Sequence, residues 1–490
     1  MAIQTNSFKS ADFRITASCA LEMSLSRQVT YFFAAALLYT ATAQLSAAKA
    51  QPELTATQRA AQFGISDIRG IGYIPGPEGP AKPIDPSFGL ADPLPYFQNT
   101  LQTYMPDRTT PYCQPHDPPY HTCHPLDATY TIYYDSDFYN ADFELLWGSP
   151  GVGRDDLGRY KFELNANFIY LYDWTQNTRL RNHIPFLDRA HALGLRVAIP
   201  ISNYTYEIMC GRVGGVTDWK TGVMNEFNEV YANGSSDPHP AAGVLKIFNE
   251  YDGSVCENPD FVAQVALYWK QLENARNVPD PQRLPIIFPV TFGIKHGIAG
   301  GAGLSAFDAI NSMPGLGLSF WKARVIYATN PFNDGSFMKR WITTELPNWF
   351  ATHNIPMDTP VMFGEYGRSS DESVPKTEAG QATWVKGQFD AMYIPKKPAG
   401  FLGAAAFINE YRFWLKPPEP NFALTDFGRG GGSWNQPAAT YIQHQLYQNP
   451  NGQPGQPWSA YYQVDQQKPR PAYCEIATVF YGNEMRPACP

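Results

Sequence analysis

Short apolar runs alternate with amphipathic stretches along most of the chain. The runs have the length of buried strands, and the stretches between them carry apolar residues at helical spacing. This alternation predicts parallel βα units. The eight predicted strands are 68–73, 168–172, 196–201, 244–248, 285–290, 324–327, 360–364 and 403–408. The predicted helices between them are 181–193, 218–231, 259–275, 336–351 and 377–391.

Eight strands with helical connections and no second sheet favour a closed (β/α)8 TIM barrel over an open doubly wound sheet. We expect this α/β barrel to span residues 51–415. Residues 75–156 are predicted to form a long loop after the first strand, because their first part is rich in Pro, Asp and Tyr and lacks helical periodicity. Residues 416–490 are rich in Pro, Gly and Gln, and are predicted to be a C-terminal extension that packs on the barrel and ends in a helix at 471–481.

The N-terminal segment 1–50 has the pattern of an export signal. Arg27 precedes an apolar stretch at 29–39, and Ala48-Lys49-Ala50 forms a small-x-small cleavage site. The signal begins naturally at Met23, which is an alternative start. The apolar stretch is short for a membrane span, so a cleaved signal is favoured over an uncleaved anchor. We therefore expect a secreted or periplasmic protein.

Cysteine usage agrees with export. An even number of cysteines after the predicted signal indicates disulfides, with free buried thiols as the alternative. Proximity along the chain favours the pairs Cys113–Cys123 and Cys474–Cys489, which leaves Cys210–Cys256. The first pair would staple the long loop after the first strand.

Composition excludes several functions. With a net charge of −8, 17% charged residues and no run of Lys or Arg, the chain does not have the pattern of a nucleic-acid-binding protein. His116, His121 and His124 are metal-ligand candidates, but prolines interrupt their segment and no paired carboxylate accompanies them. We expect no metal and no cofactor.

The 29 Tyr, 11 Trp and 30 Phe suit a groove in which rings stack on sugars. The expected partner is an oligo- or polysaccharide bound by a monomer.

Acidic residues follow three of the predicted strands. Asn249-Glu250 follows the fourth strand, Glu365 the seventh, and Asn409-Glu410 the eighth. Function in such a barrel is built at the carboxyl ends of the strands. Glu250 and Glu365 are therefore expected to face each other across the barrel mouth.

Two facing carboxyl groups are what glycoside cleavage requires, one protonated to assist the leaving oxygen and one ionised to attack the anomeric carbon. The apolar neighbours Phe248 and Tyr251 favour a protonated Glu250. A separation of about 5 Å would indicate a retaining mechanism. A single glutamate after a strand is more often a helix cap or an ion-pair partner, but the two together favour catalysis.

The strand ends resemble those of glycosidase clan A, and within it the fungal β-1,3-glucanosyltransferase and β-1,3-glucanase type. The resemblance covers roughly residues 68–415. It is carried by 69–76, 165–172, 248–250, 363–367 and 409–411. It implies a two-glutamate double displacement with Glu250 as general acid/base and Glu365 as nucleophile.

The resemblance also implies that Asn249 bonds the sugar 2-hydroxyl and that Tyr327 contacts the nucleophile. Turn capping and barrel packing are the respective alternatives. Aromatic residues near strand ends are expected to stack on sugars, with core or loop packing as the alternative. The expected substrate-binding residues are Tyr73, Asp173, Trp174, Asn203, Tyr204, Asn249, Tyr327, Glu410, Tyr411 and Trp414.

The favoured function is thus a retaining glycoside hydrolase or transglycosylase acting on a β-glucan, with β-1,3 linkages favoured. A β-1,4-glucanase or mannanase of the same clan is the nearest alternative. A non-catalytic carbohydrate-binding barrel is a second alternative, against which both intact glutamates count. A metal-dependent barrel hydrolase is a third, against which the lack of His or Asp at successive strand ends counts.

Overall fold

The chain divides into two units, residues 1–52 and 53–490, and all residues described below belong to the second. The computed structural model describes residues 53–74, 147–148, 155–172, 174, 183–212, 216–409, 419–427, 440–448, 454–464 and 467–482. The predicted signal at 1–50 and most of the predicted loop at 75–156 lie outside these ranges.

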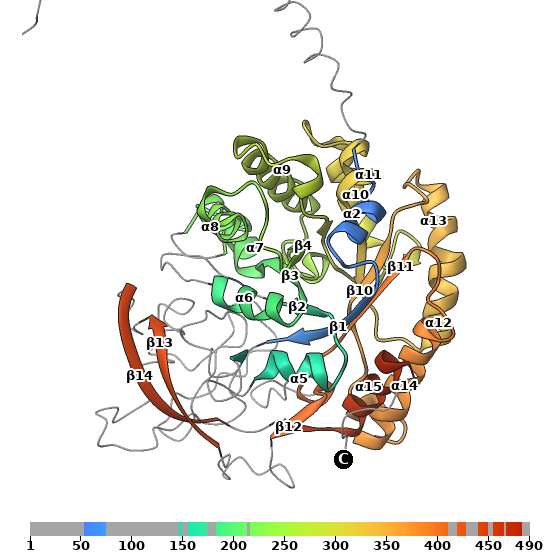
Figure 1. The fold of residues 1–490 in the computed structure, drawn as a ribbon. Coiled ribbons are helices and arrows are strands. Elements are labelled where there is room, and N and C mark those ends of the chain that lie inside the picture. The colour runs from blue at the N-terminus through green and yellow to red at the C-terminus, as the bar shows by residue number, and fades with distance from the viewer. Residues whose placement is uncertain are drawn as a thin grey trace, which may run out of the picture. The chain divides into compact units, whose positions relative to one another are not determined.

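A closed ring of parallel strands forms the centre of the second unit (Figure 1). Its strands are β1 (Ile68–Tyr73), β2 (Phe168–Leu171), β3 (Arg196–Ile201), β4 (Ala242–Ile247), β5 (Ile286–Ile287), β6 (Val290–Thr291), β9 (Tyr327–Asn330), β10 (Val361–Tyr366) and β11 (Phe401–Ala406). The hydrogen-bonded order is β5-β4-β3-β2-β1-β11-β10-β9-β6. Since β5 pairs with β4 and β6 pairs with β9, these two short strands are halves of one barrel strand, the fifth. The predicted (β/α)8 barrel is confirmed.

Prolines explain the split of the fifth strand. Pro285 and Pro289 lack the N–H that a strand interior donates. Their carbonyl oxygens still accept bonds from the backbone of the fourth strand and its loop, from Leu245 at 2.9 Å and from Glu250 at 2.8 Å. The broken strand therefore helps to fix the backbone of a predicted catalytic residue.

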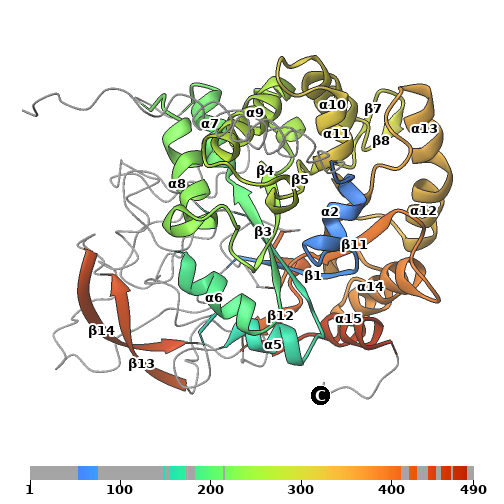
Figure 2. The ribbon, with the colours of Figure 1, turned by 45° about the horizontal axis from the view of Figure 1, so that its top comes forward.

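Helices surround the ring (Figure 2). They are α5 (Asp156–Phe162), α6 (Ile184–Ala192), α7 (Asn203–Met209), α8 (Lys220–Val230), α9 (Pro259–Ala275), α10 (Ala302–Ser312), α11 (Leu318–Arg324), α12 (Gly335–Arg340), α13 (Leu346–Thr352) and α14 (Glu378–Tyr393). A small antiparallel pair, β7 (Ile294–Lys295) and β8 (Ile298–Ala299), precedes α10. The single helix predicted at 336–351 is α12 and α13 joined by a π-helical turn at Trp341–Glu345. Within the described ranges, no helix is long and apolar enough to cross a membrane.

The sixth barrel strand lies three residues later than predicted. The sequence suggested 324–327, whereas β9 runs from Tyr327 to Asn330. Arg324 ends α11 instead, because its buried guanidinium bonds both carboxylate oxygens of Glu273, at 2.9 and 2.8 Å. The carboxyl end of this strand therefore carries Asn330 and not Tyr327.

The barrel continues past residue 415 to a last helix, α15 (Pro471–Tyr481), at the position predicted for the end of the extension. The helix packs on α14, with the Phe480 ring centroid 5.6 Å from those of both Phe389 and Tyr393. It follows the eighth strand in the chain and so completes the set of barrel helices. Two antiparallel pairs lie between β11 and α15. They are β12 (Thr425–Phe427) with β15 (Gln467–Pro469) and β13 (Thr440–Gln448) with β14 (Pro454–Val464).

The amino-terminal end of the ring is covered by α2 (Ala56–Gln62). Its buried Arg59 donates to the carbonyl oxygens of Ala323 at 2.8 Å and Arg283 at 2.9 Å, and it pairs with Asp280 at 2.9 Å. These partners precede β9 and β5 in the chain. The carboxyl ends of the strands are thus left to form the site.

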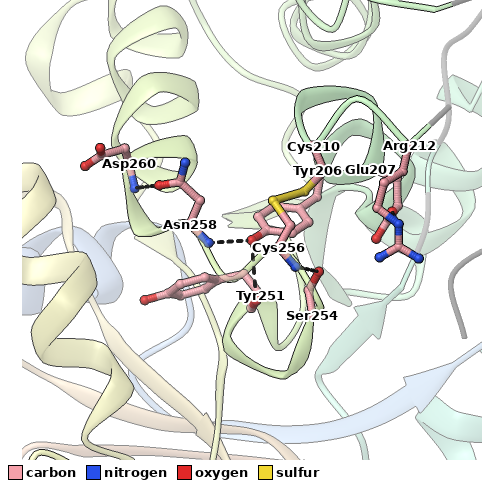
Figure 3. Close-up of a disulfide and its surroundings, with 9 residues drawn as sticks. All are labelled: Tyr206, Glu207, Cys210, Arg212, Tyr251, Ser254, Cys256, Asn258 and Asp260. Atoms are coloured by element: carbon pink, nitrogen blue, oxygen red, sulfur yellow. Dashed lines mark hydrogen bonds and ion pairs between the residues drawn. A yellow bond between two sulfur atoms is a disulfide. The ribbon is translucent and has the colours of Figure 1, made fainter. Parts of the chain in front are cut away.

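A disulfide joins Cys210 to Cys256, as the cysteine spacing predicts (Figure 3). It ties the end of α7 to the loop that follows β4. Next to it, the Tyr206 hydroxyl accepts a bond from the backbone of Asn258 at 2.8 Å, so the same loop is held twice. Cys474 is also disulfide-bonded. The other cysteines of the predicted pairs lie outside the described residues.

Candidate active site

Glu250 lies on the loop after β4, in a backbone conformation that is unusual for its residue type. Phe248 and Glu250 have φ angles of 59° and 53°, in the left-handed region that non-glycine residues seldom adopt. The loop is held there from both sides, because Phe248 donates to the Ile201 carbonyl of β3 at 3.0 Å and Glu250 to Pro289 at 2.8 Å. Such conformations cluster at functional sites.

Asn203, the first residue of α7, fixes the backbone between these two residues. Its side-chain oxygen accepts from the Asn249 N–H at 2.8 Å, and its Nδ2 donates to the Asn249 carbonyl at 3.0 Å. Asn203 was expected to bind sugar directly. The structure gives it a different task, because both ends of its amide are used on Asn249.

Glu365 projects from β10 and is buried, with 5% of its surface exposed. Asn249 Nδ2 donates to Glu365 Oε1 at 3.0 Å, and the Tyr170 hydroxyl donates to Asn249 Oδ1 at 2.7 Å. Burial, and then the charges of Glu365 and Glu250, raise the pKa of Tyr170 well above its ordinary value. Tyr170 therefore stays a donor at every physiological pH and keeps the Asn249 amide turned toward Glu365.

Asn330 completes the connection between the two glutamates. Its Nδ2 donates to Glu250 Oε1 at 2.9 Å and to Asn249 Oδ1 at 3.4 Å. The predicted role of Tyr327 is wrong, since this buried residue begins β9 and its hydroxyl donates to the Gly300 carbonyl. The residue at the end of the strand is Asn330, which the sequence analysis missed because it placed the strand three residues too early.

A cavity of about 520 Å³ opens between the ends of β4, β9, β10 and β11. Both glutamates line it, with aromatic rings from the segments after β9 and β11 and from α14. Its lining residues are Glu250, Phe332, Asn333, Asp334, Glu365, Arg368, Glu372, Trp384, Phe407 and Phe422. The ring centroids of Phe332, Phe407 and Phe422 lie 5.0 to 5.7 Å apart, so the three form one apolar wall. Such a wall beside a carboxyl pair suits a sugar ring.

The predicted aromatic contacts lie elsewhere. Tyr73 is fully buried and donates to Asp156 at 3.0 Å, so it packs in the core. Trp174 is also fully buried and donates to Glu229 at 2.7 Å. Neither can face a sugar, and both predictions are corrected. Tyr204, on α7, is 8% exposed and is not among the cavity residues. The other predicted contacts, Asp173, Glu410, Tyr411 and Trp414, lie outside the described residues.

Two buried glutamines of α14 hold the wall of the cavity. Gln388 Nε2 donates to the carbonyl oxygens of Asn333 at 2.9 Å and Gly367 at 3.0 Å. Gln381 Nε2 donates to those of Arg368 at 2.9 Å and Phe422 at 3.2 Å. One helix thus fixes the loops after β9, β10 and β11.

Arg368 is the cation among the described lining residues. Its guanidinium lies 4.8 Å from the Trp384 ring centroid and donates to the Glu372 carbonyl at 2.8 Å. Asp334 and Glu372 add two carboxylates to those of Glu250 and Glu365. The described part of the lining is therefore acidic. In the described part of the chain, no group of three or more His, Cys, Asp or Glu is arranged to hold a metal ion.

No protein-family model matches the sequence, and no curated protein matches it. Solved structures similar to this chain include a GH2 β-galacturonidase from Eisenbergiella tayi bound to galacturonate, at 13% identity over 68% of this chain and 47% of that one, with a TM-score of 0.39. The chain thus spans about half the length of that enzyme.

Two further solved structures are similar to this chain. A GH113 β-mannanase from Alicyclobacillus acidocaldarius has 11% identity over 71% of this chain and 95% of that one, with a TM-score of 0.35. Gas2p from Saccharomyces cerevisiae, solved with laminaritetraose and laminaripentaose, has 12% identity over 66% of this chain and 56% of that one, with a TM-score of 0.37. These are likenesses in the path of the backbone.

Proposed function

We propose that the protein is a retaining glycoside hydrolase or transglycosylase, with Glu250 as general acid/base and Glu365 as nucleophile. The observation that carries this proposal is that both carboxyl groups line one cavity and are joined by a continuous set of amide hydrogen bonds. Glu365 accepts a hydrogen bond from Asn249 Nδ2 at 3.0 Å, and Glu250 accepts one from Asn330 Nδ2 at 2.9 Å. Each carboxyl group thus has its own amide donor, and two carboxyl groups with different neighbours can take the different roles that glycoside cleavage needs.

The reaction has two steps. In the first, a Glu365 oxygen bonds to the anomeric carbon as the glycosidic C–O bond breaks, and the proton of Glu250 passes to the leaving oxygen. In the second, the Glu250 carboxylate takes a proton from water or from a sugar hydroxyl, whose oxygen displaces Glu365. Attack occurs twice at the same carbon, so the anomeric configuration is retained.

The proposed substrate is a β-glucan, with β-1,3 linkages favoured and β-1,4-glucan or mannan as alternatives. Support comes from the resemblance of the strand ends and from the cavity wall of Phe332, Phe407 and Phe422. Asn249 is proposed to bond the sugar 2-hydroxyl. Tyr204, Asp173, Glu410, Tyr411 and Trp414 remain proposed sugar contacts.

The test is a screen of β-glucans and β-mannans with product analysis, followed by substitution of each glutamate. Glu365→Ala should abolish activity on every substrate. Glu250→Ala should retain more activity on aryl glycosides of acidic phenols, which need little protonation, than on natural glycans. Azide should speed turnover of Glu250→Ala and give a β-glycosyl azide, whereas Glu365→Ala should give the α-azide.

An outcome without these differences would contradict the assignment. Equal losses on both kinds of substrate, with no azide rescue, would show that Glu250 is structural. Product of inverted configuration from the unmodified protein would exclude the double displacement.

A further inference from the structure

The sixth barrel strand ends in a side chain that contacts the proposed catalytic machinery without being a carboxylate. We propose that Asn330 is a positioning residue that sets the orientation of both glutamates, of Glu250 directly and of Glu365 through Asn249. This inference rests on the proposed function, because it assigns Asn330 a role in the same two-step reaction.

The first support is the direction of the hydrogen bonds. Asn330 Nδ2 has two hydrogens, and it donates to Glu250 Oε1 at 2.9 Å and to Asn249 Oδ1 at 3.4 Å. Asn249 Oδ1 also accepts from the Tyr170 hydroxyl at 2.7 Å. With two donors on its oxygen, the Asn249 amide is left with its Nδ2 facing Glu365, 3.0 Å from Oε1.

The second support is the difference between the segments that carry the two glutamates. Its backbone is in the left-handed region, on a loop and not on a strand, so the barrel does not fix the direction of its side chain as it does for Glu365 on β10. Asn330 ends β9, where its neighbour Thr329 pairs with β6 and β10, and only 1% of its surface is exposed. Asn330, a buried donor on a barrel strand, therefore holds the carboxyl group of Glu250, which lies on a loop.

The third support is an unsatisfied atom. Asn330 Oδ1 is buried and has no hydrogen-bond partner in the described part of the chain. A buried acceptor without a partner costs stability, and such groups in folded proteins usually serve another purpose. The orientation of the amide follows from its neighbours, because Asn249 Oδ1 can only accept, as can Glu250 when it is ionised. Asn330 thus keeps its Nδ2 on Glu250 at the expense of its oxygen.

The test uses Asn330→Ala, Asn330→Asp and a matched surface control, Asn348→Ala, on the exposed side of α13. The probes are aryl β-laminaribiosides with phenols of graded acidity, or the aryl glycosides of whichever glycan the screen identifies. Asn330→Ala should lower kcat/KM about 10- to 100-fold for poor leaving groups and much less for the most acidic phenol. In a Glu250→Ala background the same substitution should cost much less than in the unmodified protein, because only the effect of Asn330 on Glu365 through Asn249 remains.

Asn330→Asp keeps the shape of the side chain and places a carboxylate beside Glu250. Repulsion between like charges should move the alkaline limb of the pH–rate profile to higher pH. This variant also decides the question where Asn330→Ala fails to fold. A purely structural asparagine would leave the leaving-group dependence unchanged in both variants.

The outcomes separate the two proposals. A loss from Asn330→Ala that is equal for all phenols, or that adds fully to the loss from Glu250→Ala, overturns the role of Asn330 and leaves the glutamates assigned. If Glu250→Ala itself shows no dependence on the leaving group, the proposed function fails first. Asn348→Ala should match the unmodified protein in every assay.

Discussion

Gly364, directly before the proposed nucleophile, has no space for a side chain. A Cβ built at this position would lie 2.6 Å from Asn330 Oδ1 and 2.7 Å from the Tyr170 hydroxyl. We predict that Gly364→Ala lowers kcat/KM by about 100-fold or more, because either displacement misplaces a carboxyl group. Gly387→Ala, whose Cβ would meet nothing within 4 Å, is the matched control. It should keep full activity and gain about 0.5–1 kcal/mol of stability as a helical glycine replaced by alanine. A fully active Gly364→Ala would contradict the described geometry.

Asp252, two residues after Glu250, is expected to make the stability of the fold depend on pH. Burial raises the pKa of its carboxyl group above the ordinary value, although Thr291 bonds both oxygens, at 2.9 and 2.6 Å. An acid whose pKa is higher in the folded than in the unfolded state contributes stability below the unfolded value and loses it as the pH rises through the folded value. We therefore predict that the free energy of unfolding, compared with that of Asp252→Asn, falls between about pH 4 and the folded-state pKa. Denaturant titrations over this range check it, and a relative rise in stability with pH would show the opposite sign.

At the scale of elements, α14 acts as a support for the mouth of the barrel. Gln388 donates to the carbonyl oxygens of Asn333 and Gly367, each on a different loop. Gln388→Ala should leave both carbonyls without this donor, costing about 1–3 kcal/mol of stability and raising KM, because the cavity wall loosens. Thr383→Ala, at an exposed position of the same helix, is the control and should change neither. An unchanged KM in a destabilised Gln388→Ala would limit the role of α14 to folding.

The elements also show how far the sequence alone could lead. The apolar runs located all eight strands and both glutamates, because a buried parallel strand and the residue after it leave a local pattern. The sixth strand was misplaced because Val325 and Ile326 are apolar without belonging to it, and only the distant ion pair of Arg324 with Glu273 shows where α11 ends. Because of this error, Tyr327 was expected at the end of the strand, where Asn330 contacts Glu250.

The cavity wall could not be predicted for a related reason. Phe332 follows β9, whereas Phe407 and Phe422 follow β11 fifteen residues apart, so the three meet only in three dimensions. Each is locally indistinguishable from a core residue. Conversely, Tyr73 and Trp174, which the sequence suggested as sugar contacts, are core residues. Alternation indicates that a side chain is buried, but not in which direction it points.

At the scale of the whole molecule, α15 is needed to complete the barrel. Phe480 is 3% exposed and packs on Phe389 and Tyr393 of α14. We predict that Phe480→Ala lowers the free energy of unfolding by about 3–5 kcal/mol, as for other buried phenylalanines. Phe162→Ala is the matched control, because 61% of Phe162 is exposed and its loss should cost little. Equal effects in thermal or denaturant unfolding would mean that α15 is an appendage and not the eighth helix.

The position of α15 after all the barrel strands has a consequence for synthesis. The Phe480 carbonyl accepts bonds from Arg69 in β1 and from Asn165 before β2, at 3.2 and 2.9 Å, and β1 itself pairs with β11. A ribosome releases β1 and β2 long before it reaches these partners. The growing chain therefore keeps open strand edges until β11 and α15 have emerged, and open strand edges are prone to aggregation. For a chain with the predicted export signal, late closure also leaves it threadable through a translocation pore while it is being made.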